Sequence, residues 1–388
     1  MPVLNESRFI AETLTQIIKQ EYPTDRIQVV IADGQSTDGT VEIINSFKGR
    51  LPQLKVVSNT VGGPGAGRNL GIKHTTAPYI IVIDGHVYIP SKTLLRDMVE
   101  TFERTRAYCL CRPQPLNPPG INLFQEAVAL ARGSALGHNP DTDIYSDVEK
   151  ETDPTSSGAM WRREVFEQLG YFDEDFDACE DVDLNFRVRQ AGMKAWLSPK
   201  LRVYYYPRDS VGALWRQMFR YGVGRFRFSR KHKDLSLKQL LAPLAVLGFV
   251  VFGLASVLGA EGPQRLTGVM VTIYLALILG VTGLISLQKK KFAFVFSLPV
   301  IFPVIHFGLG TGYLVELFRE IRSRRKSGQP LNPFSEERKT TEAPPAPTRS
   351  ASSAQSASST PPADSQQPGA PPPTPPDISP TTTPDNSQ

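Results

Sequence analysis

The chain has 388 residues, and its 43 Lys and Arg residues against 38 Asp and Glu residues give a formal net charge of +5 at pH 7. An ordinary soluble protein is excluded, because residues 239–260, 266–288 and 292–315 contain no Asp, Glu, Lys or Arg and a bilayer crossing takes only about 20 apolar residues. The tail over 327–388 is expected to be disordered, since its last 54 residues hold 13 of the 33 prolines and too few apolar side chains for a core.

Predicted helices and strands alternate through the first half of the chain. Residues 6–20 place Ile10, Leu14 and Ile17 at helical spacing, and the apolar run 27–32 predicts a buried strand. The elements expected after them are helices near 38–48, 65–74 and 91–104 and strands near 54–58, 79–83 and 106–111. This alternation predicts an α/β fold with a mostly parallel sheet that helices cover on both faces.

Two acidic residues directly follow predicted strands: Asp33 and Asp84. Ligands of parallel α/β sheets bind beyond the carboxyl ends of the strands, so we expect both carboxylates at the functional edge. A strand should also precede the helix over 6–20. Either the sheet lacks that strand or the natural chain starts upstream of Met1, and we favour the upstream start.

The stretch 113–157 is rich in Pro, Gly, Asn and Asp, and it predicts a loop around one helix near 121–132. The elements expected next are helices near 162–168 and 182–191, an acid-rich loop from Asp173 to Asp183 between them, and strands near 194–197 and 201–205. Together these elements predict a catalytic domain over residues 1–209.

Residues 210–235 combine aromatic and basic side chains in one segment. They are Trp215, Phe219, Tyr221, Phe226 and Phe228 with Arg216, Arg220, Arg225, Arg227 and Arg230. This mixture can stack on nucleic acid, but directly ahead of membrane segments it favours an amphipathic interfacial helix. Residues 335–388 have a net charge of −3, so the rest of the chain has a net charge of +8. This charge suits an anionic membrane surface or an anionic substrate better than nucleic acid.

Residues 236–318 form the predicted transmembrane region. Basic residues at 230–238 and 289–291 favour a cytosolic start and a cytosolic loop after the second span. A simple third crossing would leave the basic residues of 319–326 outside. We therefore expect the prolines and glycines of 299–312 to break the third segment into a re-entrant pair, which keeps the tail in the cytosol.

Three short motifs could carry chemistry. The glycine-rich run 62–69 fits neither the dinucleotide-binding nor the Walker pattern. A helix that starts beside Arg68 could bind a phosphate or a base, but a plain turn explains the run equally well. Asp84-Gly-His86 could share one divalent cation or be a surface turn. Glu180-Asp181-Val-Asp183 could simply cap a helix or supply a general base.

These pieces together resemble glycosyltransferase family 2, whose catalytic domains have the GT-A fold, over about residues 1–230. The motifs, in the order of that family, are Pro2-Val-Leu-Asn-Glu6, Asp33-Gly-Gln-Ser-Thr-Asp-Gly-Thr40, Gly67-Arg-Asn-Leu-Gly71, Asp84-Gly-His86, Ser157-Gly-Ala-Met-Trp-Arg-Arg163 and Glu180-Asp-Val-Asp-Leu184. Within the family, Asp84-Gly-His86 and Tyr204-Tyr-Tyr-Pro-Arg208 are most similar to membrane-bound glucosyltransferases of succinoglycan-type exopolysaccharide assembly.

The resemblance implies a site for a nucleotide-sugar donor. The residues that it places around the donor are Pro2, Leu4, Glu6, Asp33, Arg68 and Asp84. Asp33 would accept a hydrogen bond from the nucleotide base, while Asp84 and His86 would hold Mg²⁺ or Mn²⁺ against the diphosphate. His86 stands where the family usually has a second Asp, which leaves the identity of the metal open.

The same resemblance implies an acceptor side. Asp181 would take the proton of the acceptor hydroxyl as it attacks the anomeric carbon in line, which inverts the configuration. Glu180, Gln217, Arg220 and Tyr221 would lie near the acceptor and the diphosphate, because Gln217-Met-Phe-Arg220-Tyr221 resembles the Q-x-x-R-W element of related synthases. Tyr221 replaces the usual Trp, which leaves its stacking role open.

Two further residues receive no catalytic role in this interpretation. We expect Asp183, two residues beyond Asp181, to be structural. His232 lies in a basic stretch, where we expect a solvated side chain rather than a third metal ligand.

The sequence thus predicts a multi-pass, metal-dependent, inverting glycosyltransferase of the inner cell membrane with a cytoplasmic catalytic domain. We expect UDP-glucose or a related donor, a lipid-linked saccharide acceptor in extracellular polysaccharide biosynthesis, and polysaccharide assembly proteins as further partners. Two alternatives stay open: a polyprenyl-phosphate sugar synthase, and an inactive relative that binds nucleotide or scaffolds an assembly complex. Asp33, Asp84 and Asp181 are all present, which favours an active enzyme.

Overall fold

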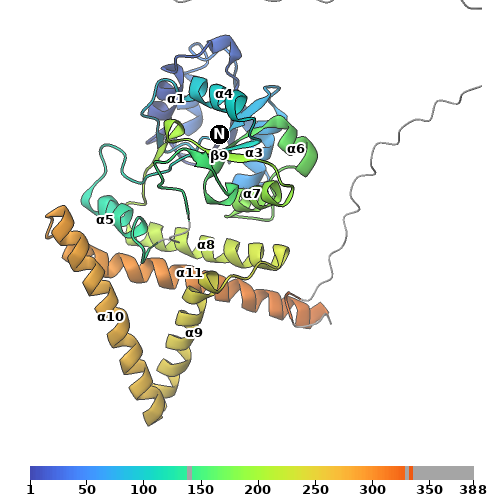
Figure 1. The fold of residues 1–388 in the computed structure, drawn as a ribbon. Helices are drawn as coiled ribbons and strands as arrows, with labels where there is room; N and C mark the ends of the chain where they lie inside the picture. Colours follow the sequence, from blue (N-terminus) through green and yellow to red (C-terminus); the bar gives the residue numbers. More distant parts are fainter. Residues whose placement is uncertain (138–141, 328–331, 335–388) are drawn as a thin grey trace, which may run out of the picture. The chain divides into compact units, whose positions relative to one another are not determined.

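The first three strands form a parallel sheet, as the alternation of helices and strands predicts (Figure 1). The computed structural model describes residues 1–137, 142–327 and 332–334. The strands, in spatial order, are β1 (Pro2–Val3), β2 (Val29–Asp33) and β3 (Leu54–Ser58). A strand ahead of the helix predicted over 6–20 is therefore present, although it comprises only two residues. Val3 pairs with Asp33 and Asp33 with Ser58, so the carboxyl ends of the three strands are level.

The helices that connect these strands bury the apolar faces predicted from their spacing. They are α1 (Ile10–Ile18), α2 (Thr40–Asn45), α3 (Pro64–Lys73) and, after the next strand, α4 (Leu94–Thr105). Ile10 and Leu14 of α1 are fully buried in one core cluster with Ile31 of β2 and Phe102 of α4. Burial of these stripes anchors both helices to the sheet.

The second sheet is mixed, and three of its five strands share one direction. Its strands, in spatial order, are β4 (Tyr79–Ile81), β8 (Gly158–Arg162), β6 (Cys109–Cys111), β9 (Ala195–Leu197) and β7 (Lys150–Glu151). Strand β6 pairs with β9 in parallel, and the other three pairings are antiparallel. Strand β8, the second in this order, comes from a segment that the sequence did not predict as a strand. It runs antiparallel to both of its neighbours, β4 and β6.

Within the described part of residues 1–209, the remaining elements are three α-helices and a short pair of strands. They are α5 (Leu123–Arg132), α6 (Arg163–Leu169), α7 (Glu180–Gln190) and a two-stranded antiparallel pair of β5 (Val87–Tyr88) with β10 (Tyr204–Tyr205). Trp161 of β8, Phe166 of α6 and Leu184 of α7 share a second buried cluster. This packing fixes the start of α7 relative to the sheet.

Four long helices follow the catalytic domain. They are α8 (Val211–His232), α9 (Leu237–Val257), α10 (Glu261–Lys289) and α11 (Phe294–Ser327). The last three are long and apolar enough to cross a membrane. Helix α11 runs without interruption through Pro299 and Pro303, which corrects the expectation that this segment breaks into a re-entrant pair. The predicted disordered tail lies, apart from Ser327 and residues 332–334, outside the described residues.

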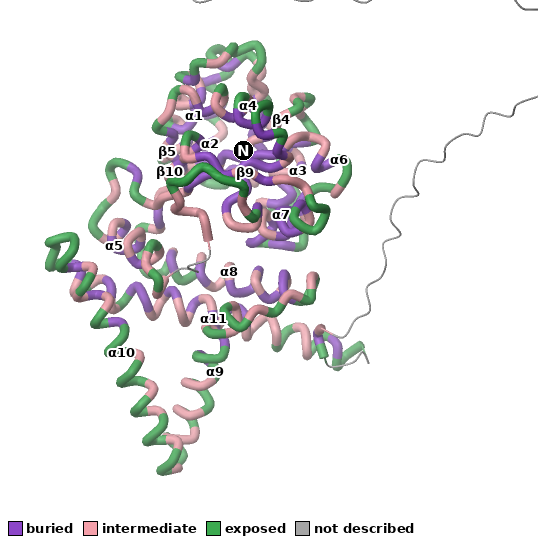
Figure 2. The backbone as a smooth tube through the Cα atoms, in the orientation of Figure 1, coloured by how far each residue is buried: buried purple, intermediate pink, exposed green. Residues whose placement is uncertain are grey.

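Burial distinguishes α11 from the two helices that precede it (Figure 2). In their most apolar stretches, 44% of α11 is buried, against 11% of α9 and 17% of α10. The apolar faces of α9 and α10 are largely exposed, whereas α11 is packed against other parts of the chain.

Candidate active site

The turn that carries Asp84 and His86 is held against the connection between β1 and α1. Thr13 Oγ1 of α1 donates a hydrogen bond to the Gly85 carbonyl at 2.8 Å. A Cβ atom on Gly85 would lie 2.7 Å from Cγ of Glu6, so only glycine allows this approach. The structure therefore brings Glu6, Asp84 and His86 together at the carboxyl end of the sheet, where ligands of α/β folds bind.

Arg68 lies beside two carboxylates at the same edge. From α3, its Nη1 reaches Glu180 Oε1 of α7 at 2.5 Å, and its Nη2 lies 3.9 Å from Asp84 Oδ1. The guanidinium also lies over the ring of Phe172, 5.4 Å from its centroid. Its Nε is buried without a hydrogen-bond partner among the described residues. Arg68 thus joins α3, α7 and the Asp84 turn, and it retains one unused donor.

His86 forms its closest polar contact with Glu6, not with Asp84. The distance from Nδ1 of His86 to Oε1 of Glu6 is 2.7 Å, and both side chains are mostly buried. The burial of His86 lowers its pKa, but the hydrogen bond and charge of Glu6 and the charge of Asp84 outweigh this effect and raise the pKa above its ordinary value. With Nδ1 committed to Glu6, Nε2 is the ring nitrogen left to face a ligand.

Asp33 ends β2 and is occupied by its own turn. Its carboxylate accepts hydrogen bonds from the backbone N–H groups of Gln35 and Ser36 at 3.1–3.3 Å. Pro2 of β1 packs against Gly67 of α3, where a Cβ atom would lie 3.0 Å from it, and Leu4 is exposed beside this turn. The residues predicted around the nucleotide base thus lie along the β1–β2 edge.

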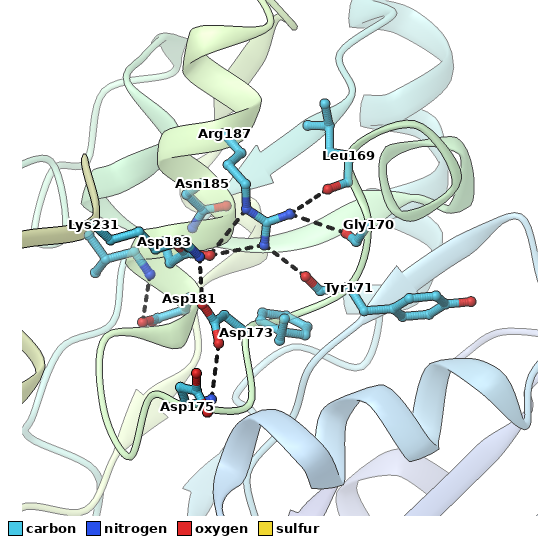
Figure 3. Close-up of polar contacts among 12 residues, drawn as sticks. Leu169, Gly170, Tyr171, Asp173, Asp175, Asp181, Asp183, Asn185, Arg187 and Lys231 are labelled. Atoms are coloured by element: carbon cyan, nitrogen blue, oxygen red, sulfur yellow. Dashed lines mark hydrogen bonds and ion pairs between the residues drawn. The ribbon is translucent and has the colours of Figure 1, made fainter. Parts of the chain in front are cut away.

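The first turn of α7 separates two acids with different surroundings. Asp181 is half-buried, and its carboxylate accepts a hydrogen bond from the N–H group of Val182. No ion pair of Asp181 exists among the described residues. Asp183 is fully buried, and its carboxylate pairs with Arg187 at 3.0 Å and with Lys231 of α8 at 2.7 Å (Figure 3).

Asp183 also lies 2.7 Å from Nε2 of His232. The His232 ring packs between Phe186 and Phe228, with centroids at 4.3 and 4.9 Å. This contact corrects the expectation of a solvated histidine, because the side chain fills the junction between α7 and α8. Burial would raise the pKa of Asp183, but its bonds to His232 and Lys231 and the charge of Arg187 hold it well below the usual range.

Burial has the opposite result at Glu180. Desolvation raises the pKa of this carboxyl to about 6, although the charge of Arg68 acts to lower it. For Arg68, burial acts against the charge, but Glu180 and Asp84 outweigh it and raise the pKa above its ordinary value. In the Arg68–Glu180 pair, the charge of Arg68 therefore does not fully offset the cost of burying the Glu180 carboxylate.

The Q-x-x-R-Y residues lie on α8 and contact the loop before α7 and helix α5. Arg220 Nη2 donates a hydrogen bond to the Asp177 carbonyl at 2.5 Å. Gln217 reaches the Tyr221 hydroxyl at 3.5 Å, and the Arg132 guanidinium of α5 lies 5.7 Å from the Tyr221 ring centroid. Among the described residues, no hydrogen bond or ion pair joins these α8 residues to Asp84 or Asp181, so their place beside the acceptor stays a prediction.

The sequence analysis assigned no role to two residues beside the site, the buried Arg112 and the partly buried Tyr205. Arg112 is fully buried, and its Nη2 donates hydrogen bonds to the Val82 carbonyl and the Tyr205 hydroxyl, both at 3.0 Å. Burial raises the pKa of Tyr205 to about 12. Arg112 directly follows the predicted strand 106–111, so the rule that selected Asp33 and Asp84 would also have selected it.

Asp84 and His86 fit a divalent cation that is shared with a diphosphate. Glu6 holds the His86 ring by its Nδ1, as carboxylates commonly hold the second ring nitrogen of metal-binding histidines. The described residues contain no group of three acidic, His or Cys side chains that could hold a metal by themselves. Mg²⁺ commonly uses one or two protein ligands with substrate phosphates and water, so two side chains suffice.

Comparison with known proteins was made by sequence and by structure. The Glycosyl transferase family 2 model matches residues 1–170. Succinoglycan biosynthesis protein ExoA of Rhizobium meliloti (strain 1021) is 33% identical over 249 residues, which cover 63% of this chain and 74% of that protein. Dolichyl N-acetyl-alpha-D-glucosaminyl phosphate 3-beta-D-2,3-diacetamido-2,3-dideoxy-beta-D-glucuronosyltransferase of Methanococcus voltae is 24% identical over 326 residues, which cover 82% of this chain and 96% of that protein.

A solved structure shares the fold. The mannosyltransferase PcManGT from Pyrobaculum calidifontis, in complex with GDP-Man and Mn²⁺, is similar with a TM-score of 0.51 at 20% identity. The match covers 77% of this chain and 84% of that chain. At this identity the likeness concerns the fold alone.

Proposed function

Because the chain belongs to glycosyltransferase family 2 and has the GT-A fold that its motifs predict, we propose that it is a membrane-anchored, inverting glycosyltransferase. It transfers a hexose from a nucleotide-activated donor, UDP-glucose or a related sugar, to a lipid-linked saccharide. The observation that carries this proposal is the cluster of Arg68, Asp84 and Glu180 beside the Glu6–His86 pair at the carboxyl edge of the sheet.

The donor side follows from charge. A nucleoside diphosphate is an anion, and Arg68 offers a buried guanidinium with one unused N–H at this edge. Asp84 and His86 would hold Mg²⁺ or Mn²⁺, and the ion would neutralise charge on the departing diphosphate. Asp33 would contact the base, with Pro2, Leu4 and Glu6 from the neighbouring β1 segment beside it. PcManGT was solved with a nucleotide sugar and Mn²⁺, which supports this type of donor site.

Asp181 is the proposed general base. Its carboxylate lies at the start of α7, next to Glu180, and it has no cation partner at ion-pair distance among the described residues. A carboxylate that is not committed to an ion pair can accept the proton of an attacking hydroxyl. Asp183, fully committed to Arg187, Lys231 and His232, cannot do so without breaking that cluster.

The acceptor side rests on the apolar helices and on the relatives. Three helices are apolar enough to span a membrane, and they follow α8, which carries Gln217, Arg220 and Tyr221. One relative is named for succinoglycan biosynthesis and another for transfer to a dolichyl-phosphate-linked sugar. The apolar helices and the names of the two relatives agree with a lipid-linked saccharide as the acceptor. It would be presented at the cytoplasmic membrane face, within an extracellular polysaccharide pathway.

The test is a donor screen with the full chain in membranes and lipid-linked acceptors. We expect transfer from one nucleotide hexose, with the product in the lipid extract as an elongated saccharide. A product with one sugar on the lipid phosphate would instead identify a polyprenyl-phosphate sugar synthase. No turnover with any donor, together with intact nucleotide binding, would favour the inactive scaffold.

The metal is tested separately from turnover. His86→Ala should weaken Mn²⁺ binding, measured by electron paramagnetic resonance in the presence of nucleoside diphosphate, and EDTA should stop transfer. His74→Ala, on the exposed end of α3, is the matched control. Unchanged Mn²⁺ binding in the His86 variant would remove this residue from the metal site.

A further inference from the structure

We propose that α11 does not cross the membrane but lies along its surface, paired with α8 beneath the catalytic domain. The chain then crosses the bilayer twice, through α9 and α10. This inference concerns the path of the chain and does not depend on the proposed transfer reaction.

Helix α11 is poorly suited to a perpendicular crossing. Its 34 residues span about 51 Å at ~1.5 Å per residue, whereas the hydrocarbon core of a bilayer is about 30 Å thick. Pro299 and Pro303 lie inside the helix and do not divide it into two short segments. A single helix that leaves the interface and returns is therefore excluded as well.

Helices α8 and α11 are in direct backbone contact. A Cβ atom on Gly308 would lie 2.8 Å from Cβ of Met218, and one on Gly312 would collide with the Phe219 carbonyl. A Cβ atom on Gly222 would collide with the Leu309 carbonyl. Glycine at these positions permits the close approach that small residues allow between membrane helices.

Ion pairs continue the same contact toward the end of both helices. Arg227 Nε lies 2.8 Å from Glu316 Oε1, and Arg230 pairs with Glu320. Residue numbers rise together in both helices, so they run parallel from position 218 of α8 to position 230. If α11 crossed the bilayer, α8 would enter it too, with its five arginines. Charged side chains at the bilayer centre are costly, which opposes that arrangement.

The first half of α11 is covered by α5 of the catalytic domain. Lys291, just ahead of α11, pairs with Glu126 at 2.7 Å. Ala127 and Ala131 of α5 share a buried cluster with Leu298 and Ile301 of α11. Other helices therefore accompany α11 along most of its length, first α5 and then α8.

Helix α11 passes the open end of the α9–α10 hairpin (Figure 1), and its contacts reach about halfway along it, to Tyr274 of α10, whose hydroxyl lies 3.0 Å from Nδ1 of His306. On α9, Ala242 and Val246 meet Gly310, and the Phe249 ring lies 5.5 Å from Phe307. At the far end of the hairpin, Val257 and Leu258 are each 86% exposed. Three parallel crossing helices would instead touch along their whole length, so the contacts describe a helix that passes across the open end of a hairpin.

Charge agrees with this path. The basic residues of 319–326 and of 289–291 would lie on the same side as α8, which satisfies the positive-inside rule without a break in α11. Phe296, Val300 and Phe318 on α11 are exposed apolar side chains. They would enter the boundary between head groups and acyl chains, as in interfacial helices.

Cysteine labelling in cells that express the full chain tests the number of crossings. The test uses three single variants: Gly262→Cys in the first turn of α10, Lys289→Cys at the end of α10 and Ser353→Cys in the tail. Each is exposed to an impermeant thiol reagent before and after permeabilisation. The three native cysteines are buried, and the unsubstituted chain gives the background. We expect positions 289 and 353 to share one side and position 262 to lie on the other.

Labelling of 353 together with 262, on the side opposite to 289, would overturn the proposal, because it requires a third crossing. Labelling of all three on one side would overturn the two crossings. If 289 and 353 are both outside, the path of the chain stands, and the cytoplasmic orientation under the proposed function fails instead. The two proposals are thus separated.

Cross-linking and depth measurements test the position of α11 itself. Arg230→Cys with Glu320→Cys should join through a short bis-thiol cross-linker in membranes, whereas Arg230→Cys with Gly262→Cys should not. A bimane label at Val300→Cys should be quenched at least twofold more by lipids spin-labelled near the head group than by lipids labelled at the chain end. Absence of the first cross-link, or stronger quenching from the chain end, would contradict the surface position.

Discussion

The first turn of α7 carries two buried carboxylates that belong to two different polar clusters and whose pKa values are shifted in opposite directions. In the site cluster, Glu180 pairs with Arg68, and burial raises its pKa to about 6. In the junction cluster, Asp183 bonds to Arg187, Lys231 and His232, which hold its pKa well below the usual range. The two carboxyls are three residues apart, so their different behaviour comes from partners rather than from the helix.

The contrast indicates that the junction cluster serves stability, whereas the site cluster is suited to ligand binding. Compensation of Asp183 by three cationic or polar partners fixes α7 against α8, and breaking such a buried network is expensive. Arg68 and Glu180 keep an unused donor and an elevated pKa, which are features of sites that receive a charged ligand. Asp181, the proposed general base, lies in sequence between Glu180 of the site cluster and Asp183 of the junction cluster.

The largest effect is expected for the residue between the clusters. Asp181→Asn should lower kcat by roughly 10²- to 10⁴-fold, because general base catalysis supplies about that factor. Nucleotide affinity should stay within about twofold, since no donor contact is assigned to this carboxylate. The measurement is single-turnover transfer together with nucleotide titration, and Asp175→Asn in the preceding loop is the control. Near-normal transfer in the Asp181 variant would remove it from the mechanism.

Breaking the junction cluster should act on stability instead. Asp183→Asn leaves Lys231, His232 and Arg187 without their shared carboxylate, and the loss of one partner of a buried ion cluster costs about 3–5 kcal/mol. Chemical unfolding of the detergent-solubilised full chain measures this change. An unfolding free energy within about 1 kcal/mol of the unsubstituted chain would show that the cluster contributes little.

The two clusters should also differ in the sign of their pH dependence. Glu180 has a raised pKa, so its contribution to stability is complete below about pH 4 and is lost as pH rises through 6; the change is about 2 kcal/mol for a shift of this size. Asp183 has a lowered pKa, so its contribution is complete above about pH 4 and is lost as pH falls.

Unfolding free energies of Glu180→Gln and Asp183→Asn, measured against pH from 3 to 7, check these signs. Relative to the unsubstituted chain, the Glu180 variant should gain stability as pH rises, while the Asp183 variant should lose it. Parallel profiles for the two variants would contradict the opposite settings inferred for the clusters.

The sequence predicted most of the fold because the helices and the parallel strands have strong local patterns. Helix α1 and strand β2 follow from apolar spacing alone. Strand β8 was missed, because its residues Gly158–Arg162 lack alternation and follow a long loop, and only its pairing with β4 and β6 makes it a strand. The mixed direction of the sheet follows from that missed strand.

Helix α11 shows the limit of breaker signals. Pro299 and Pro303 predict an interruption, yet the helix continues, because contacts with neighbouring helices compensate for lost backbone hydrogen bonds. At the site, motif order selected Arg68, Glu180 and Asp84, which the structure brings together. The assignment of roles to these residues stays a prediction, since no ligand contact identifies the atoms that react.

His232 was misjudged for a physical reason that also gives the last and smallest prediction. A histidine in a basic stretch has no local signal of burial, because its partners Asp183, Phe186 and Phe228 come from the tertiary fold. His232→Phe should retain the ring packing and remove one hydrogen bond to a charged carboxylate, which costs about 1.5–3 kcal/mol. Lys231 and Arg187 remain as partners of Asp183, so the loss should stay below that of Asp183→Asn. The two variants are compared by the same unfolding measurement, and an equal loss would mean that the histidine bond alone holds the junction together.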